Sequence, residues 1–192
     1  MNYQDYIWDL GGTLLDNYET STAAFVHTLQ DFGLTASHDE VYKALKVSTD
    51  YAVRQFAPGN KEFLKAYKAN EAKELEHPIL FEGASELLAQ IIQQGGRNFL
   101  ISHRDDQVLE ILQKTQINAY FTEVVTATNG FKRKPDPESM LYLKDKYQIE
   151  SGLVIGDRPI DIEAGQAAGF SCYLFDNMRN LEEFVDIELE KE

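Results

Sequence analysis

The stretch Tyr6-Ile7-Trp8-Asp9-Leu10-Gly11-Gly12-Thr13 carries more information about the fold and the chemistry of this chain than any other. Its first three residues are apolar and predict a short buried strand, with Asp9 at the strand's end. Two glycines and a threonine then predict a tight loop, where the bare glycine backbone lets a charged ligand come close. The N–H groups of such a loop can bind an anion. The stretch therefore predicts a carboxylate beside an anion-binding loop.

Further along the chain, strand and helix patterns alternate. Short apolar or β-branched runs predict strands at Phe99–Ile101, Val124–Thr126, Leu153–Ile155 and Tyr173–Phe175. Amphipathic runs predict helices at Ala84–Gln94, Asp105–Thr115, Pro137–Tyr147 and Ile160–Ala168. This alternation predicts an α/β fold, a doubly wound Rossmann-like parallel sheet with helices on both faces.

One interval breaks the alternation, because no convincing strand lies between Leu15 and Leu80. An ordinary connection in such folds is far shorter than these roughly sixty residues. The interval carries amphipathic patterns instead, at Thr20–Phe32, Asp39–Lys46, Asp50–Phe56 and Lys61–Leu75. We therefore predict a small helical cap domain at residues 16–80, inserted into a Rossmann-like catalytic core made of residues 1–15 and 81–192.

Composition narrows the class of protein. The chain has 192 residues, of which 43% are hydrophobic, so it can bury a substantial core. Its net charge of -14 argues against a nucleic-acid partner, which requires basic surfaces. The single cysteine, Cys172, excludes an internal disulfide. No apolar run reaches transmembrane length and no signal-peptide pattern is present, so we expect a cytoplasmic protein without a membrane partner.

Polar residues follow four of the predicted strands. Asp9 follows the first, Ser102 the second, Lys134 lies in the loop after the third, and Asp157 follows the fourth, with Asp161 four residues later. The carboxyl ends of parallel strands meet at one edge of the sheet, where ligands bind in such folds. We therefore expect these side chains to converge.

A cluster of this kind suits phosphate chemistry. Three carboxylates against one lysine are unfavourable until a cation joins them, and oxygen ligands suit Mg²⁺. With Mg²⁺ and Lys134 in place, the site attracts a phosphate group. Ser102 and the N–H groups of Leu10 and Gly11 can donate hydrogen bonds to its oxygens. Asp9 can then attack phosphorus and form an aspartyl-phosphate.

These motifs resemble the haloacid dehalogenase superfamily, in the subgroup of phosphoglycolate phosphatase-like hydrolases with a helical cap. The resemblance covers nearly the whole chain and rests on Asp9–Leu14, Ser102, Lys134-Pro135, and Gly156-Asp157 with Asp161. It implies a Mg²⁺-dependent phosphatase acting on a small phosphorylated metabolite. The sequence leaves the choice between a monomer and a homodimer open. By this resemblance Asp9 is the nucleophile. Ser102 and Lys134 hold phosphate beside His103, and Asp9, Gly11, Asp157 and Asp161 bind the metal.

Gly11 departs from the family pattern, which places a second aspartate there as general acid and base. A glycine keeps the backbone carbonyl that binds the metal but has no side chain to transfer a proton. Since general acid–base catalysis contributes typically ~10²–10⁴-fold, we expect a slow phosphatase or one restricted to good leaving groups. His103, Asp16 or His27 are candidate replacements.

Two alternatives remain open at this stage. The first is a hydrolase that cleaves carbon–phosphorus bonds. Relatives of this kind have a small residue at the position of Gly11 and form a Schiff base with a lysine of the cap. The candidate lysines in this chain are Lys43, Lys46, Lys65 and Lys68. The other alternative is a protein that binds a phosphorylated ligand or a partner without hydrolysing it.

Overall fold

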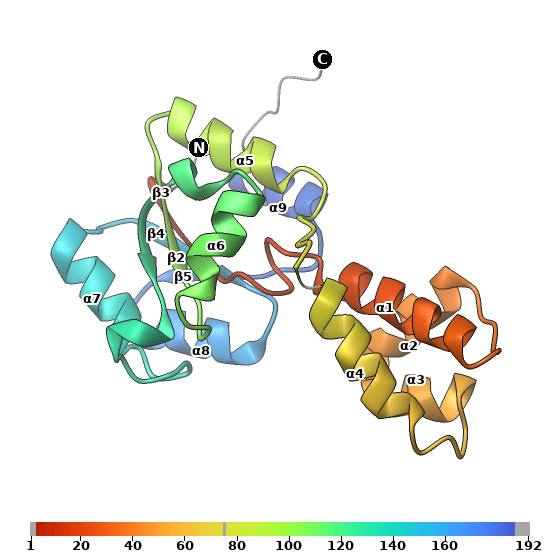
Figure 1. The fold of residues 1–192 in the computed structure, drawn as a ribbon. Coiled ribbons are helices and arrows are strands. Elements are labelled where there is room, and N and C mark those ends of the chain that lie inside the picture. The colour runs from red at the N-terminus through yellow and green to blue at the C-terminus, as the bar shows by residue number, and fades with distance from the viewer. Residues whose placement is uncertain (1–2, 75, 187–192) are drawn as a thin grey trace. The chain divides into compact units, whose positions relative to one another are not determined.

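The computed structural model describes residues 3–74 and 76–186 and divides into two compact units. One comprises residues 1–15 with 80–192, and the other comprises residues 16–79. Figure 1 shows the first as strands covered by helices and the second as helices alone. Each unit is described by itself.

The larger unit is built on a parallel five-stranded sheet with the strand order β3-β2-β1-β4-β5. The strands are β1 (Asp5–Trp8), β2 (Arg97–Ile101), β3 (Phe121–Val125), β4 (Gly152–Gly156) and β5 (Ser171–Leu174). The helices of this unit are α5 (Ala84–Gln93), α6 (Gln107–Lys114), α7 (Glu138–Tyr147), α8 (Pro159–Ala167) and α9 (Met178–Val185), with short 3-10 turns η1 (Asn118–Tyr120) and η2 (Ala127–Asn129). The predicted α/β class is confirmed.

Alternation along β1 explains the two helical layers. Tyr6 and Trp8 pack into an apolar cluster with residues of α5, α6 and α9, whereas Ile7 packs into a second cluster with residues of α7 and α8. Successive side chains of a strand point to opposite faces, so the wholly apolar run Tyr6–Trp8 must be covered on both. β1 lies at the centre of the sheet, which places Asp9 at the middle of its carboxyl edge.

Two predicted strands are shifted in the structure. The strand predicted at Val124–Thr126 extends one residue beyond the end of β3. Thr126 caps η2 instead, where its side chain accepts a hydrogen bond from the N–H of Thr128. The strand predicted at Tyr173–Phe175 is also shifted toward the C-terminus, since β5 begins at Ser171 and ends at Leu174. Cys172 of β5 is only partly buried, because β5 is an edge strand.

The smaller unit is helical and has its own core. It comprises α1 (Asn17–Asp31), α2 (His38–Val47), α3 (Thr49–Phe56) and α4 (Phe63–Glu74). Phe25 is fully buried at its centre, with ring centroids 4.9 Å from Phe63 and 5.0 Å from Tyr67. α4 begins at Phe63 because the Asn60 side chain accepts hydrogen bonds from the first backbone N–H groups. Residue 75, where this helix was predicted to end, lies outside the described residues.

Candidate active site

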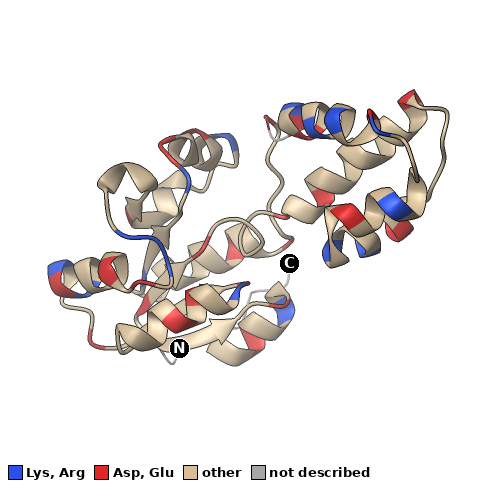
Figure 2. Cartoon of the chain, turned by 90° about the horizontal axis from the view of Figure 1, so that it is seen from below, with Lys and Arg blue, Asp and Glu red and all other residues tan. Residues whose placement is uncertain are grey.

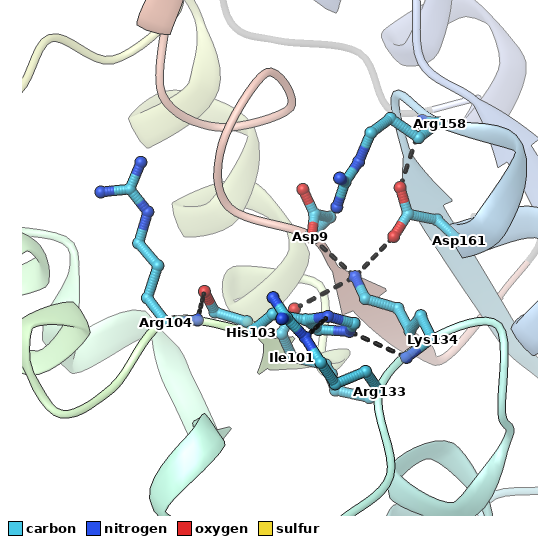
Figure 3. Close-up of polar contacts among 9 residues, drawn as sticks. Asp9, Ile101, His103, Arg104, Arg133, Lys134, Arg158 and Asp161 are labelled. Carbon is cyan, nitrogen blue, oxygen red and sulfur yellow. Dashed lines mark hydrogen bonds and ion pairs between the residues drawn. The ribbon is translucent and has the colours of Figure 1, made fainter.

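A buried lysine joins two aspartates at the carboxyl edge of the sheet. Lys134 comes from the loop between β3 and α7, and its Nζ lies 2.6 Å from Asp9 Oδ1 and 2.5 Å from Asp161 Oδ1. A third, longer hydrogen bond of 3.4 Å runs from the same Nζ to the carbonyl of Ile101 at the end of β2 (Figure 3). The Lys134 side chain is 1% exposed, so these contacts are screened little by solvent.

Asp157 completes the cluster. It follows β4, and Asp161 lies in the first turn of α8, where its Oδ2 accepts a hydrogen bond from the N–H of Arg158. One carboxylate oxygen from each of Asp9, Asp157 and Asp161 lies within 4.8 Å of the other two. The structure therefore brings together the acidic residues that the sequence placed at separate strand ends.

Two glycines allow this close approach. Gly12 has a φ of +83°, and a Cβ there would lie 2.7 Å from Asp157 Cγ. A Cβ on Gly156 would collide with the carboxylate of Asp161. A side chain at either position would push an acidic group out of the cluster, so the backbone here is shaped around these carboxylates.

The cluster carries more negative charge than its single lysine balances. Burial, followed by repulsion from Asp9 and Asp161, raises the pKa of Asp157 to about 6. Burial also raises the pKa of Asp9, although Lys134 opposes this. Within the described residues, the buried Asp157 Oδ1 accepts no hydrogen bond. Three carboxylates that each bring an oxygen within 4.8 Å of the other two, with Asp157 Oδ1 free of hydrogen bonds, fit a hard divalent cation such as Mg²⁺.

The loop after Asp9 is closed by its own backbone. The N–H groups of Thr13, Leu14 and Leu15 donate to the carbonyl of Leu10, while the N–H of Gly12 donates to Leu15. These bonds leave the N–H groups of Leu10 and Gly11 without a partner in the described part of the chain. The loop can thus offer both to an anion.

Ser102 and His103 follow β2. The Ser102 hydroxyl accepts a hydrogen bond of 3.2 Å from the N–H of Arg104, which leaves its own proton available to a ligand. His103 faces two N–H donors: the Lys134 N–H lies 2.9 Å from Nε2, and Arg133 Nε lies 3.0 Å from Nδ1. A neutral ring can accept only one of these hydrogen bonds, because its other nitrogen carries the proton.

His103 does not suit the role of replacement acid. Burial, followed by repulsion from Lys134 and Arg133, lowers its pKa to about 4. The imidazole is therefore uncharged near neutral pH and has no acidic proton to give to a leaving group. The His103 ring instead contacts the backbone of Lys134, whose N–H lies 2.9 Å from Nε2.

The candidates in the helical unit have local roles there. Asp16 is the N-cap of α1, and its Oδ1 accepts the Glu19 N–H at 3.0 Å. His27 lies 3.8 Å from Asp31, and both side chains are more than half exposed. The lysines weighed as Schiff bases, Lys43, Lys46, Lys65 and Lys68, are all exposed. A Schiff-base lysine needs burial or a neighbouring cation to lower its pKa, so this observation does not favour a carbon–phosphorus hydrolase.

The sequence reasoning missed Arg158, whose side chain extends toward Asp9 in Figure 3. The only signal for it was its place directly after Asp157. It brings a second cationic side chain to the site and opposes the rise in the pKa of Asp9.

A parallel α/β sheet with this aspartate–lysine cluster at its carboxyl edge is typical of a hydrolase that handles phosphate. The family model of haloacid dehalogenase-like hydrolases matches residues 6–175, and the chain belongs to this family. The resemblance predicted from the motifs is thereby confirmed, and the chain is an enzyme of the hydrolase class.

Similar proteins agree with this assignment. The chain is 29% identical to a phosphoglycolate phosphatase from Aliivibrio fischeri, over 88% of this chain and 81% of the relative. It is 25% identical to a pyrophosphatase from Oceanobacillus iheyensis, with coverages of 88% and 81%. The crystal structure of a hydrolase from Streptococcus pneumoniae is 70% identical, with a TM-score of 0.93 and coverages of 97% and 100%. Among the described residues, no helix is long and apolar enough to span a membrane.

Proposed function

We propose that this protein is a Mg²⁺-dependent phosphatase that hydrolyses a small phosphorylated metabolite through a phosphorylated Asp9. The observation that carries the proposal is the buried contact of Lys134 with both Asp9 and Asp161, beside the carboxylate of Asp157. Such a cluster is costly to bury unless a cation and an anionic substrate complete it. The phosphatase names of the relatives support the same reaction class.

The metal would be held by the carboxylates of Asp9, Asp157 and Asp161 and by the backbone carbonyl of Gly11. When bound, Mg²⁺ neutralises negative charge as it develops on the transferred phosphoryl group. The unpartnered Asp157 Oδ1 and the proximity of the three acids are the observations that make the residues fit this ion.

The reacting group would be the Asp9 carboxylate. One of its oxygens forms a bond to phosphorus while the bond from phosphorus to the leaving oxygen breaks, which gives an aspartyl-phosphate. Water then attacks this phosphorus, the bond from phosphorus to the Asp9 oxygen breaks, and the carboxylate is restored while the proton of the water passes to solvent. Lys134, the Ser102 hydroxyl and the N–H groups of Leu10 and Gly11 would hold the phosphoryl oxygens during both steps.

The leaving group would depart without help from position 11. Gly11 has no side chain, and the neutral His103 cannot donate a proton near pH 7. Leaving groups that are stable as anions, such as acyl and aryl oxygens, should therefore react much faster than alkyl oxygens. We propose that the enzyme is slow on alkyl phosphates for this reason.

The test is Mg²⁺-dependent release of phosphate from acetyl phosphate and p-nitrophenyl phosphate. We expect turnover by the natural protein, and loss of it in Asp9→Asn. Asp136→Asn serves as the matched control, because Asp136 lies near the site in sequence but is 36% exposed and faces Lys132. Turnover that persists in Asp9→Asn would refute the proposed nucleophile, and binding of both esters without turnover would refute the reaction.

A further inference from the structure

His103 joins two segments of the larger unit that lie far apart in the sequence. It follows β2, and its ring Nε2 lies 2.9 Å from the backbone nitrogen of Lys134, in the loop between β3 and α7 (Figure 3). His103 is partly buried and Lys134 is buried. The contact therefore ties the segment that carries the buried ammonium group to the carboxyl end of β2.

Few other hydrogen bonds fix the backbone of this segment. Among the described residues, the Lys134 N–H is the only backbone group of residues 131–136 that bonds to a part of the chain outside the loop and α7. The other hydrogen bonds of these backbone groups stay inside the loop or reach α7. The place of this backbone beside β2 thus depends on the His103 ring.

The loop carries three cations in a row. Lys132, Arg133 and Lys134 follow one another in the sequence, and Lys and Arg are drawn in blue in Figure 2. Of these three, Lys134 enters the acidic cluster and contacts Asp9 and Asp161, whereas the other two are exposed. A shift of the loop by one residue would bring a neighbouring side chain to the carboxylates. The hydrogen bond to the Lys134 backbone fixes the register that prevents this.

The two neighbours of the His103 ring decide which of its nitrogens carries the proton. Nε2 faces the Lys134 N–H and Nδ1 faces Arg133 Nε, and a neutral ring can accept only one of these hydrogen bonds. The N–H of the buried Lys134 is costly to leave unpaired. The Arg133 side chain is exposed and can turn toward water instead. Nε2 is therefore the acceptor, and Nδ1 carries the proton.

We propose that His103 is a positioning residue, which accepts a hydrogen bond from the Lys134 backbone through Nε2 and so keeps the Lys134 ammonium group in contact with Asp9 and Asp161. A lysine side chain is a flexible stem, so its ammonium group keeps one position only where its backbone does. His103 acts in this role through Lys134 and not on the reacting atoms. The inference rests on the proposed function, in which Lys134 holds phosphoryl oxygens.

Binding of inorganic phosphate tests this role. Titration calorimetry with Mg²⁺ compares the natural protein with His103→Gln, His103→Phe and His103→Asn. Glutamine can place its side-chain oxygen near the position of Nε2, asparagine is too short to do so, and phenylalanine keeps the ring shape without an acceptor. We expect His103→Gln to bind phosphate within about threefold of the natural affinity. The other two variants should bind about tenfold or more weakly, since a charged hydrogen bond from Lys134 contributes at least that much.

The order of these variants separates positioning from the filling of space. A ring that only filled space would be replaced best by phenylalanine, so the two roles predict opposite orders for His103→Gln and His103→Phe. His77→Phe is the matched control, because it makes the same substitution at an exposed histidine. It should keep the natural affinity.

The tautomer of His103 provides a second test, which needs neither a variant nor a ligand. Two-bond proton–nitrogen NMR spectra of the metal-free natural protein near neutral pH distinguish a protonated ring nitrogen from an unprotonated one. Backbone assignment identifies His103 among the four histidines of the chain. We expect a proton on Nδ1 and none on Nε2.

The outcomes separate this inference from the phosphatase proposal. A proton on Nε2, natural phosphate affinity in His103→Phe or His103→Asn, or a His103→Gln variant as weak as His103→Phe would each overturn the positioning role. The phosphatase proposal survives all of these results. If the natural protein binds no phosphate, the phosphate site itself is wrong, and the positioning role fails with it whatever the tautomer.

Discussion

Replacing Lys134 by methionine tests how the charge of the acidic cluster is balanced. The ammonium group is 1% exposed and contacts Asp9 at 2.6 Å and Asp161 at 2.5 Å, so its loss leaves buried carboxylates unpaired. Breaking a buried ion pair by removing one partner costs about 3–5 kcal/mol. We therefore expect the free energy of unfolding of the metal-free protein to fall by about that amount at pH 7.5.

The loss of unfolding free energy in Lys134→Met should depend on pH, in a direction that follows from the pKa of Asp9. Lys134 lowers the pKa of Asp9 against the effect of burial, so without it the pKa in the folded state rises further above that in the unfolded chain. A carboxyl with a raised pKa favours folding at low pH, and this contribution is lost as pH rises through the folded-state value. The deficit of the variant should hence grow as pH rises through the folded-state pKa of Asp9.

Urea unfolding with fluorescence detection provides the assay. The single tryptophan, Trp8, is 1% exposed and precedes Asp9 directly, so its emission reports on the site. Lys132→Met is the matched control, because Lys132 lies in the same loop with a 73% exposed side chain and should change stability by less than about 0.5 kcal/mol. Equal unfolding midpoints for the two variants, or a deficit that shrinks toward pH 8, would refute the reasoning.

Four further predictions concern the site and the sheet beside it. Gly11→Asp should raise the turnover of alkyl phosphates by about 10²–10⁴-fold and change that of acetyl phosphate little, as measured by steady-state kinetics. An equal change for both substrates would contradict the idea that a missing general acid limits the enzyme. Mg²⁺ should raise the thermal midpoint of the natural protein but not of Asp157→Asn. Because the pKa of Asp157 is raised to about 6, the affinity for Mg²⁺ measured by calorimetry should weaken as pH falls through 6. Asn98→Ala should cost about 3 kcal/mol in urea unfolding, since buried Asn98 accepts from Trp8 Nε1 and donates to the carbonyls of Leu88 and Tyr120; a cost below about 1 kcal/mol would show that these groups find other partners.

Some parts of the structure could not be located from local patterns. β3 ends before Thr126 because the Thr126 side chain caps η2. The β-branched threonine also favours a strand, so its sequence alone does not show which of the two structures it adopts. The role of His103 was equally hidden, because its pKa is lowered first by burial and then by Lys134 and Arg133, which lie 31 and 30 residues away in the chain.

By itself, the sequence determined the layered fold and the set of chemical groups at one edge of the sheet. Alternating apolar strands and amphipathic helices fix a parallel sheet, and the carboxyl ends of parallel strands must meet at one edge, so Asp9, Ser102 and Asp157 had to lie there. Only the tertiary structure decided how these groups pair. Lys134 contacts Asp9 across 125 residues of chain, and a contact so distant depends on how loops fold onto the sheet rather than on any local periodicity.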